Sequence, residues 1–375
     1  MNSHITATGY ARFGRRSEPL IELASEAAGA ALSAHGRKPI DLLVVANMLS
    51  GSINGAENLV SRVANQIGLE TAAGVRVEAA SASGAAAFHT AVLAVESGVY
   101  ERVLVVAAEK MTDRPTAEVA AALAHSLHPT EQAVGATMPA LSALVSQLYA
   151  ERYGTGTEVF DQVSRAARAA AQKNPYAQFQ KPVTLEEIRS SRMVASPLRL
   201  LHCAAISDGA VAVVLERGHG PAGVLGIGQA FEAMALVDRA DLTTFAASRG
   251  AAERAFALAG CSRRDVQVVE AHDAFAPFLL IDLEDLGFTP AGTAGRWYAE
   301  SPPPGAPSVN PSGGILGRGH PVGASGLAEI ADVARQLLGE SGAAQLDPRP
   351  RIGLAHSIGG LASHNFVTLL GGPAV

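Results

Sequence analysis

The stretch Asn310-Pro-Ser-Gly-Gly-Ile-Leu-Gly-Arg-Gly-His-Pro-Val-Gly-Ala-Ser-Gly326 places six glycines around one histidine, His320. Glycines allow a backbone to turn tightly and to approach a ligand closely. Pro321 keeps His320 out of helical conformation, and a helix is predicted to begin near Ser325, so that its free amides lie close to the histidine. The same residues also fit a glycine-rich turn with a surface histidine. Taken alone, they slightly favour that simpler interpretation.

Outward from this stretch, strand-like apolar runs alternate with alanine-rich helical runs. In the first half we predict a helix at 20–34, strands at 41–46 and 76–79, a helix at 83–97 and a strand at 103–108. Such alternation predicts an α/β fold, and strands that are apolar throughout indicate helices on both faces of the sheet. Between about 114 and 197 the pattern becomes mostly helical, with helices predicted at 139–153 and 160–172.

After a predicted strand at 210–216, a second cycle of the same kind begins. It contains helices at 251–259 and 326–338, and strands at 266–270, 352–355 and 365–370. Ser83-Gly84 opens the long helix of the first cycle, and Ser325-Gly326 opens that of the second. This similarity between the two cycles predicts two duplicated halves. We place them at 1–235, with the helical excursion at about 114–197, and at 236–375.

The composition limits the classes of function. The chain has 375 residues, of which 48% are hydrophobic and 17% charged, and its net charge is −6. These values and the absence of Lys/Arg blocks predict a globular protein that does not bind nucleic acid. The longest apolar runs are of strand length, so no membrane span is expected, and the N-terminal residues do not resemble a secretory signal.

The cysteines and histidines add two further expectations. Cys203 and Cys261 are the two cysteines, which is too few for a disulfide framework. No Cys/His spacing suggests a structural zinc or another metal site. The cytoplasm is therefore the expected compartment.

Three further segments match one known family in its own order. Val77-Glu-Ala-Ala-Ser-Ala-Ser-Gly84 resembles the nucleophile segment of thiolases, with Ser81 at the position of the cysteine. Glu270-Ala-His-Asp-Ala-Phe275 resembles the His-Asp-x-Phe motif of the archaeal and sterol-carrier-protein-linked thiolase branch. His356-Ser-Ile-Gly-Gly360 resembles the C-terminal glycine loop. The Gly-His-Pro stretch resembles the thiolase signature, and shorter matches at 107–113, 174–179 and 207–210 extend the resemblance over nearly the whole chain.

The resemblance to the thiolase superfamily implies a fold and an activity. The implied fold has two duplicated α/β halves in five layers, αβαβα, with a mostly helical loop domain, and is usually a homodimer. The implied enzyme is an acyltransferase of lipid metabolism, similar to acetyl-CoA acetyltransferase, whose coenzyme A thioester is substrate rather than cofactor. Archaeal members can work with a small partner protein that carries a zinc ribbon and an OB-like fold. This chain lacks that zinc motif, so such a partner would be a separate protein.

The resemblance also implies the site residues, and the chemistry explains their types. Acyl transfer needs a nucleophile at a helix N-terminus, where amide dipoles stabilise its anion, and Ser81 precedes the predicted helix at 83–97. His320 is implied as the base that takes the proton. Donors must hold the thioester oxygen: His272 and His320 are implied for one oxyanion hole, and the amides of Ser81 and Gly359 for the other. Ser357 stands where many thiolases carry an acid/base cysteine and is a possible acid/base.

Ser81 is the main departure from the family. A thiolate is abundant near neutral pH because cysteine has a pKa of ~8.5, whereas a serine hydroxyl attacks only while a base removes its proton. Three explanations stay open. Ser81 is an engineered replacement of cysteine that traps substrate; or native serine serves a reaction without an acyl-enzyme, such as retro-aldol cleavage of a 3-hydroxyacyl-CoA; or serine is the nucleophile for transfer to another acceptor.

Two alternatives belong to other classes of function. The chain could be a non-catalytic CoA-binding subunit of a larger complex, although such a subunit need not keep His272, His320 and Gly359. A nucleotide-binding oxidoreductase is disfavoured, because no Gly-x-Gly-x-x-Gly motif follows an early strand.

Several polar residues have simpler interpretations, and the substrate's details stay open. Asp208 is interpreted as structural, and His89 as a packing residue. The phosphates of CoA need basic groups, for which Arg192, Arg199 and Arg318 are candidates, and the sequence does not choose among them. The acyl group and the direction of the reaction are not determined by the sequence.

Overall fold

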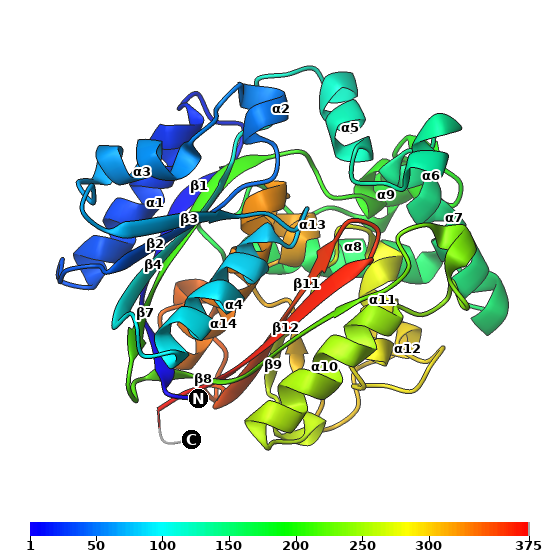
Figure 1. Ribbon diagram of the computed structural model, residues 1–375. Coiled ribbons are helices and arrows are strands. Elements are labelled where there is room, and N and C mark those ends of the chain that lie inside the picture. Colours follow the sequence, from blue (N-terminus) through cyan, green and yellow to red (C-terminus); the bar gives the residue numbers. More distant parts are fainter. Residues whose placement is uncertain (374–375) are drawn as a thin grey trace.

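The fold of this chain repeats one strand pattern twice. In the computed structural model, which describes residues 1–373, ten strands join in the order β10-β9-β11-β12-β8-β1-β7-β4-β2-β3 (Figure 1). From either edge inward, two parallel pairings are followed by two antiparallel ones. The halves meet where β1 and β8 pair at His4 and Ile5. The duplication predicted from sequence is therefore confirmed by topology.

The strands and helices have the following bounds. The strands are β1 Ser3–Gly14, β2 Leu42–Ala46, β3 Ala73–Val77, β4 Arg102–Glu109, β5 Met193–Ala195, β6 Leu198–Arg199, β7 Asp208–Arg217, β8 Ala222–Phe231, β9 Val268–Glu270, β10 Ser308–Val309, β11 Ile352–Gly359 and β12 His364–Gly371. The helices are α1 Leu20–Ala34, α2 Ser50–Asn54, α3 Leu59–Ile67, α4 Ser83–Glu96, α5 Thr116–Ala124, α6 Pro129–Ala133, α7 Met138–Tyr153, α8 Glu158–Ala171, α9 Leu185–Ser190, α10 Ala246–Ala259, α11 Ala276–Asp285, α12 Gly295–Ala299, α13 Gly314–Arg318 and α14 Val322–Leu338.

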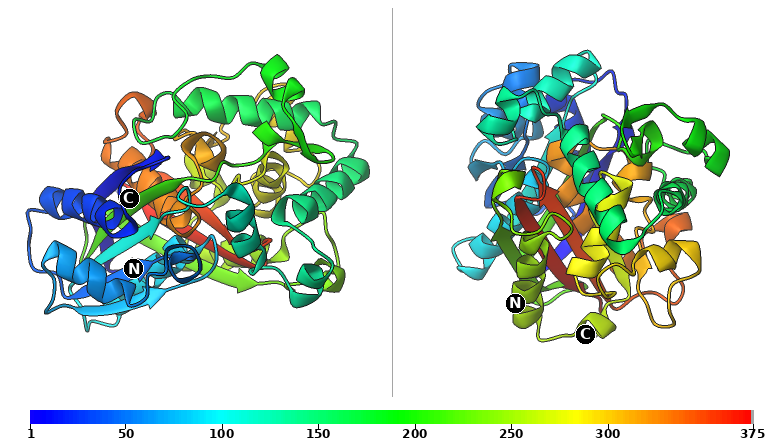
Figure 2. Two further views of the ribbon diagram at one scale, coloured as in Figure 1. Left: turned by 90° about the horizontal axis from the view of Figure 1, so that it is seen from above. Right: turned by 90° about the vertical axis from the view of Figure 1, so that its right-hand side faces the viewer.

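Five layers result from this duplication. Helices α4 and α14 pack against each other between the two half-sheets, as Figures 1 and 2 show. Helices α1 and α3 cover the outer face of the first half-sheet, and α10 covers that of the second. Strands β2 and β4 are buried on both faces, because helices lie on both sides of them. Between β4 and β7 the chain leaves the layers and forms the mostly helical excursion from α5 to α9.

The two central helices approach each other backbone to backbone. A Cβ atom added at Gly84 would lie 2.5 Å from the amide nitrogen of Leu327, and one at Gly326 would lie 2.9 Å from the amide nitrogen of Ala85. Real Cβ atoms do not tolerate such distances, so glycine is required on both sides of this contact. The Ser-Gly dipeptide that opens each predicted helix therefore marks the contact between them.

Most predicted elements are found within a few residues of their predicted bounds, and a few elements differ or were not predicted. Helix α14 begins at Val322 rather than near Ser325, and Pro321 is its N-cap residue with an extended backbone. Strand β11 extends to Gly359, so the predicted glycine loop is partly a strand. Strand β8 was not predicted, because its glycines suggested a break; a Cβ atom at Gly228 would lie 2.0 Å from the carbonyl oxygen of Ala251. Strand β1 was also not predicted.

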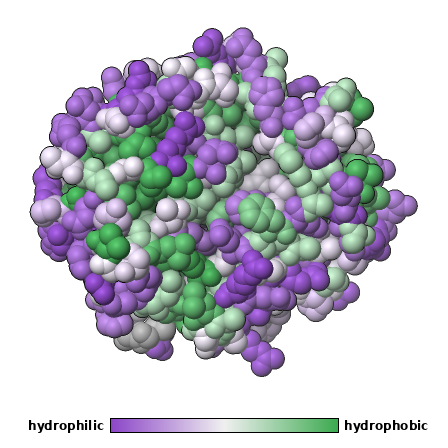
Figure 3. Space-filling view, viewed as in Figure 1, coloured by the Kyte–Doolittle hydropathy of each residue, from purple (hydrophilic) through white to green (hydrophobic). Residues whose placement is uncertain are grey.

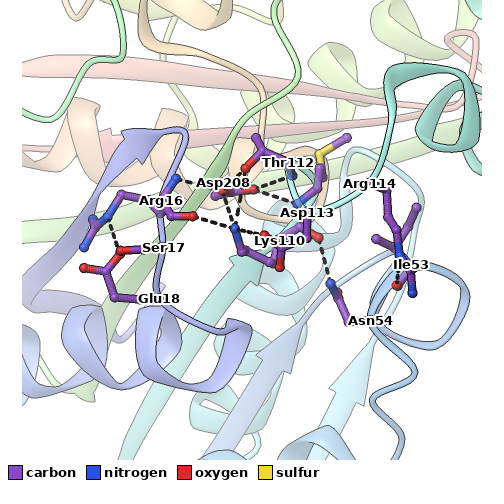
Figure 4. A network of polar contacts seen from close by, with 11 residues as sticks. Arg16, Ser17, Glu18, Ile53, Asn54, Lys110, Thr112, Asp113, Arg114 and Asp208 are labelled. Carbon is purple, nitrogen blue, oxygen red and sulfur yellow. Dashed lines mark hydrogen bonds and ion pairs between the residues drawn. The ribbon is translucent and has the colours of Figure 1, made fainter.

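A buried ion pair fixes the chain where it leaves the first half-sheet (Figure 4). Asp208, at the start of β7, accepts hydrogen bonds from Lys110 Nζ at 2.8 Å, from the amides of Met111 and Thr112 at 2.7 and 2.8 Å, and from the amide of Arg16. Lys110 Nζ also donates to the carbonyl of Arg16 at 2.7 Å. The network joins the loops after β1 and β4 to β7, so Asp208 is structural, as the sequence predicts.

No helix within residues 1–373 is long and apolar enough to cross a lipid bilayer. Strand β8 pairs along most of its length with β12, so the passage between the half-sheets lies before β8. The predicted division into 1–235 and 236–375 stays a prediction.

The contact between the central helices can be tested by Gly84→Ala. The added methyl group has no space against α14, so we expect the free energy of unfolding to fall by about 1–3 kcal/mol. The control is Gly29→Ala in α1, where a Cβ atom would meet nothing within 4 Å, and which we expect to stabilise by about 0.4–1 kcal/mol. Denaturant unfolding of both variants measures the difference, and equal midpoints would contradict the packing argument.

Candidate active site

A pocket of about 280 Å³ lies at the carboxyl ends of the parallel strands, between the two halves and the helical excursion. Ser81, His272 and His320 all line it. Ser81 and His320 come from equivalent places in the two halves, since one precedes α4 and the other precedes α14. Ligands of α/β proteins commonly bind at the carboxyl ends of parallel strands. The three side chains implied by the motifs are therefore brought together.

Ser81 stands on a tight turn at the N-terminus of α4. The preceding residue, Ala80, has a φ of 50°, which is the left-handed region that residues with a Cβ atom rarely adopt. The hydroxyl of Ser83 holds this turn, because it accepts a hydrogen bond from the amide of Ala79 at 2.9 Å and donates to the carbonyl of Ala80 at 2.6 Å. Strained backbone of this kind is often found at functional sites. The turn keeps Ser81 in the pocket at the positive end of the helix dipole.

His320 is held as a neutral imidazole whose base nitrogen is available to the pocket. The hydroxyl of Ser325 donates to the carbonyl of Pro321 at 3.2 Å and lies 2.8 Å from Nδ1 of His320. A hydroxyl has one proton, so when Ser325 donates to Pro321 it accepts a hydrogen bond from Nδ1–H, and the lone pair of the imidazole is then on Nε2. Burial is the main cause that lowers the pKa of His320 well below its usual value, and the neighbouring His272 ring and the charge of Arg318 act in the same direction.

His272 lies beside His320 and has a different support. The two rings meet edge to face with centroids 5.3 Å apart. Nδ1 of His272 lies 3.1 Å from Oε1 of Glu329, and both side chains are buried. Burial, followed by the charge of Arg318, lowers the pKa of His272 to about 3. His272 is therefore neutral near pH 7, and its Nε2 is the nitrogen left for a ligand.

Gly359 is placed against the Ser81 turn. A Cβ atom at this position would lie 2.6 Å from the carbonyl oxygen of Ala79 and 3.4 Å from the Cβ atom of Ala82, so glycine is needed there. Gly359 lines a second cavity of about 420 Å³, which shares Gly360 and Ser126 with the first. Gly359 therefore packs against the turn that carries Ser81, and the implied role of the Ser81 and Gly359 amides as an oxyanion hole stays a prediction.

Ser357 is placed differently from the other implied residues. It is buried in β11, and a Cβ atom at Gly326 would lie 2.6 Å from its Oγ, so its side chain faces α14. It lines neither of the two cavities. Its possible role as an acid/base stays a prediction, and direct contact with a substrate in the pocket would require it to turn.

Buried charged groups hold the site loops from behind. Glu109, at the end of β4, accepts hydrogen bonds from the amides of Met48, Leu49 and Gly323, which ties the start of α14 to the first half-sheet. Burial raises the pKa of Glu109 to about 7. Asp273 accepts a hydrogen bond from the amide of Ile315 at 2.5 Å, and burial raises its pKa to about 7 as well. Both carboxyl groups therefore accept hydrogen bonds from backbone amides of the protein itself.

The walls of the pocket are mainly apolar and carry one arginine. The apolar walls include Met111, Met138, Leu200, Ile206, Phe275 and Phe278. Arg192 is exposed and lines the same pocket. In contrast, Arg318 is fully buried in an ion pair with Asp332, and Arg199 donates to the carbonyl of Ser191. Of the three arginines named from the sequence, Arg192 is the one that this pocket contains.

The structure also places residues that the sequence analysis did not assign to the site. Cys203 lines the pocket, and burial raises the pKa of its thiol to about 12. Ser325 and Glu329 support the two histidines from one face of α14; their spacing of four residues is the signal that was available. His89, interpreted as a packing residue, is buried and lies 2.9 Å from Oγ1 of Thr368. Within residues 1–373, no cluster of His, Cys, Asp and Glu is arranged to hold a metal ion.

Comparisons with known proteins match most of the chain to one family. The family model described as thiolase, N-terminal domain, matches residues 2–218, and the one described as thiolase C-terminal domain-like matches residues 228–372. An acetyl-CoA acetyltransferase of Methanothermobacter thermautotrophicus is 40% identical over 332 residues, which cover 86% of each chain. Sterol carrier protein 2 of Bos taurus is 29% identical over 305 residues, which cover 74% of this chain and 55% of that protein.

One similar solved structure is named after a different reaction. The Ltp2-ChsH2(DUF35) aldolase superposes with a TM-score of 0.84 at 26% sequence identity, over 100% of this chain and 98% of that one. The scaffold is thus shared with an acetyltransferase and with an aldolase.

The neutral state of the two site histidines can be tested by NMR of protein labelled with ¹⁵N-histidine. A free histidine takes up its proton near pH ~6.5. Burial disfavours the charged form, so lowering the pH from about 8 to about 5 should leave the ring signals of His272 and His320 unchanged. Loss of one signal set in His272→Asn and in His320→Asn assigns them. A midpoint near pH ~6.5 for either ring would contradict the buried, neutral site.

Proposed function

This chain belongs to the thiolase superfamily, in the branch that contains archaeal acetyl-CoA acetyltransferases and sterol carrier protein 2, and we propose that it forms or breaks a carbon–carbon bond next to the thioester of an acyl-CoA. The activity proposed first is acyl transfer. The observation that supports it is the meeting of Ser81, His272 and His320 in one pocket. CoA enters as part of the substrate, and the proposal needs no separate cofactor.

Acyl transfer at this site follows from the neutral histidines. Oγ of Ser81 attacks the thioester carbon while its proton passes to Nε2 of His320. The carbon–sulfur bond then breaks, and the same proton passes to the leaving thiolate, so that CoA departs as a thiol and Ser81 carries an ester. A second acyl-CoA loses its Cα proton to the freed base, and its enolate attacks the ester carbon. The ester carbon–oxygen bond then breaks, Oγ of Ser81 takes the proton back from Nε2 of His320, and a 3-ketoacyl-CoA is released. The helix N-terminus and the nearby donors stabilise the oxyanions.

Retro-aldol cleavage is the second candidate, and Ser81 is the observation that favours it. Here Nε2 of His320 removes the proton of a 3-hydroxyl group, and the bond between C2 and C3 breaks. The carbonyl fragment leaves, and the enolate of the acyl-CoA stays bound until it is protonated at C2. This reaction forms no acyl-enzyme, so it does not need a cysteine. The structural relative named as an aldolase supports this candidate.

The proposed CoA contact is Arg192. An exposed guanidinium at an apolar pocket suits a ligand with an apolar or neutral arm and a charged end, and arginine binds phosphate through paired hydrogen bonds. CoA has this character, since its pantetheine arm is neutral and its other end carries phosphates. Arg318 cannot take this role while it is buried with Asp332.

We also propose a homodimer in the cytoplasm. Strand β3 is an unpaired sheet edge, and Figure 3 shows apolar residues over the face that β3 and α4 present. Val75 and Leu93 belong to this face and are 40% and 59% exposed. Apolar patches and open edges favour association.

Both cysteines are free, as is usual in a reducing compartment. A separate small partner with a zinc ribbon and an OB-like fold stays part of the proposal, since the aldolase relative carries a second component in its name.

The reaction is tested by intact mass and turnover of the native chain, Ser81→Ala and Ser81→Cys, with acetyl-CoA, longer acyl-CoAs and 3-hydroxyacyl-CoAs. If Ser81 is the nucleophile, the native chain gains an acyl mass, and Ser81→Ala loses both that mass and ~10³-fold or more in turnover. Ser81→Cys should gain the mass faster, because its thiolate is a stronger nucleophile.

The outcome that selects the second candidate is equally definite. In that case neither the native chain nor Ser81→Ala is acylated, and both cleave a 3-hydroxyacyl-CoA at similar rates. His320→Asn lowers this cleavage by ~10²–10⁴-fold, because it removes the base. Failure of every variant on every acyl-CoA would reject both enzymatic candidates and favour the CoA-binding subunit.

CoA binding is tested by the two cysteines, because Cys203 lines the pocket whereas Cys261 follows α10 outside it. Saturating CoA should slow alkylation of Cys203 by an uncharged reagent at alkaline pH and leave that of Cys261 unchanged. In Arg192→Gln, we expect about tenfold more CoA to be needed for protection, a loss of about 1.4 kcal/mol. Pantetheine, which lacks the phosphates, should protect both forms equally. Unchanged protection by CoA in Arg192→Gln would reject the contact.

A further inference from the structure

The two site histidines have different partners at the same ring atom. Nδ1 of His320 faces the hydroxyl of Ser325, and Nδ1 of His272 faces the carboxyl group of Glu329. The partner at Nδ1 decides which nitrogen carries the proton, and so whether Nε2 donates or accepts a hydrogen bond. For His320, the hydrogen bond from the Ser325 hydroxyl to Pro321 favours a proton on Nδ1 and an accepting Nε2. Whether Nε2 of His272 donates or accepts a hydrogen bond depends on whether Glu329 is charged.

The surroundings of Glu329 do not support a charge. Glu329 is 1% exposed, and within residues 1–373 its Oε2 has no partner at normal hydrogen-bond geometry, although the Ser357 hydroxyl is near enough to act on its pKa. The cation that acts on it, Arg318, is already paired with Asp332. Isolated buried carboxylates are costly, and the group takes up a proton instead.

Neighbouring acids add to this effect. Asp332 raises the pKa of Glu329, and Asp273 and Asp282 are buried carboxyls in the same electrostatic neighbourhood. Burial is the largest cause, and together with Asp332 it raises the pKa of Glu329 well above the usual value, although Arg318 and the Ser357 hydroxyl act in the opposite direction. His272 is neutral as well, so the pair holds one carboxyl proton and one ring proton.

We propose that Glu329 is a positioning residue whose neutral carboxyl group donates a hydrogen bond to Nδ1 of His272 and thereby keeps the ring proton on Nε2, where it can donate to the substrate's thioester oxygen. The site then contains two neutral histidines in opposite tautomers. His320 Nε2 accepts a proton from the reacting group, and His272 Nε2–H stabilises the oxygen on which negative charge develops.

This assignment serves both candidate reactions, because a thioester oxyanion and an enolate oxygen need the same donor. It rests on the proposed function in one respect, namely that the pocket binds a thioester. The assigned tautomer itself is a property of the free protein. It can therefore be measured whether or not a substrate is known.

The decisive measurement is the ¹⁵N NMR spectrum of the histidine-labelled native protein without ligand. His272→Asn assigns the His272 signals. We expect the proton on Nε2 and an unprotonated Nδ1 that accepts a hydrogen bond. In Glu329→Met, which has a similar volume and no donor, the preference for this tautomer should be lost. A native spectrum with the proton on Nδ1 of His272 would overturn the proposal, because Glu329 would then be the acceptor.

Kinetics of two variants give an independent readout. Glu329→Gln keeps a neutral donor and should retain kcat within about threefold, whereas Glu329→Met should lower kcat by ~10–100-fold with little change in KM. Thermal unfolding of both variants checks that they fold. Equal losses in the Gln and Met variants would show that a neutral donor at this position does not support activity, and would overturn the proposal. Inactivity of the native chain on all acyl-CoAs rejects the proposed function and leaves the NMR result to decide the tautomer.

Discussion

The contact between α4 and α14 is the constraint on which the rest of this structure depends. Gly84 and Gly326 allow the two backbones to touch, and each helix begins just after a site loop. The contact therefore sets the distance between the Ser81 turn and the His320 turn. A larger residue at either glycine would separate the halves where their reactive side chains meet. Packing at the centre of the molecule therefore determines the geometry of the pocket.

Burial then decides the charge states at this centre. The low-dielectric layer between the half-sheets disfavours charge on both histidines and on the carboxyls around them. One buried arginine, Arg318, is matched by Asp332, and Glu329 and Asp273 have raised pKa values. A site of neutral acids and neutral bases can still transfer protons, provided that hydrogen bonds assign each proton to one atom. Ser325 and Glu329 supply those bonds from the same helix.

The position of Ser81 shows how one scaffold can support more than one reaction. The strained turn, the helix N-terminus and the two histidines would activate a thiol, yet the residue present has a hydroxyl. A serine hydroxyl acts as a nucleophile only with the help of a base. Formation of an enolate needs a base and the oxyanion donors but no nucleophile. The same pocket therefore suits acyl transfer and retro-aldol cleavage to different degrees. The choice between them depends on the chemistry of one atom.

Local patterns in the sequence determined much of this protein. Apolar runs such as those of β2 and β4, and the alanine-rich runs of α4 and α14, predict their elements because periodicity reflects which faces are buried. The order of the motifs, through the family resemblance, also predicted that Ser81, His272 and His320 share one site. Tertiary structure alone decided which strands pair, that the glycines of β8 face a helix, and that Arg192 rather than Arg318 lines the pocket. It also placed Glu329 behind His272. These facts join residues far apart in the chain, and only packing determines such distances.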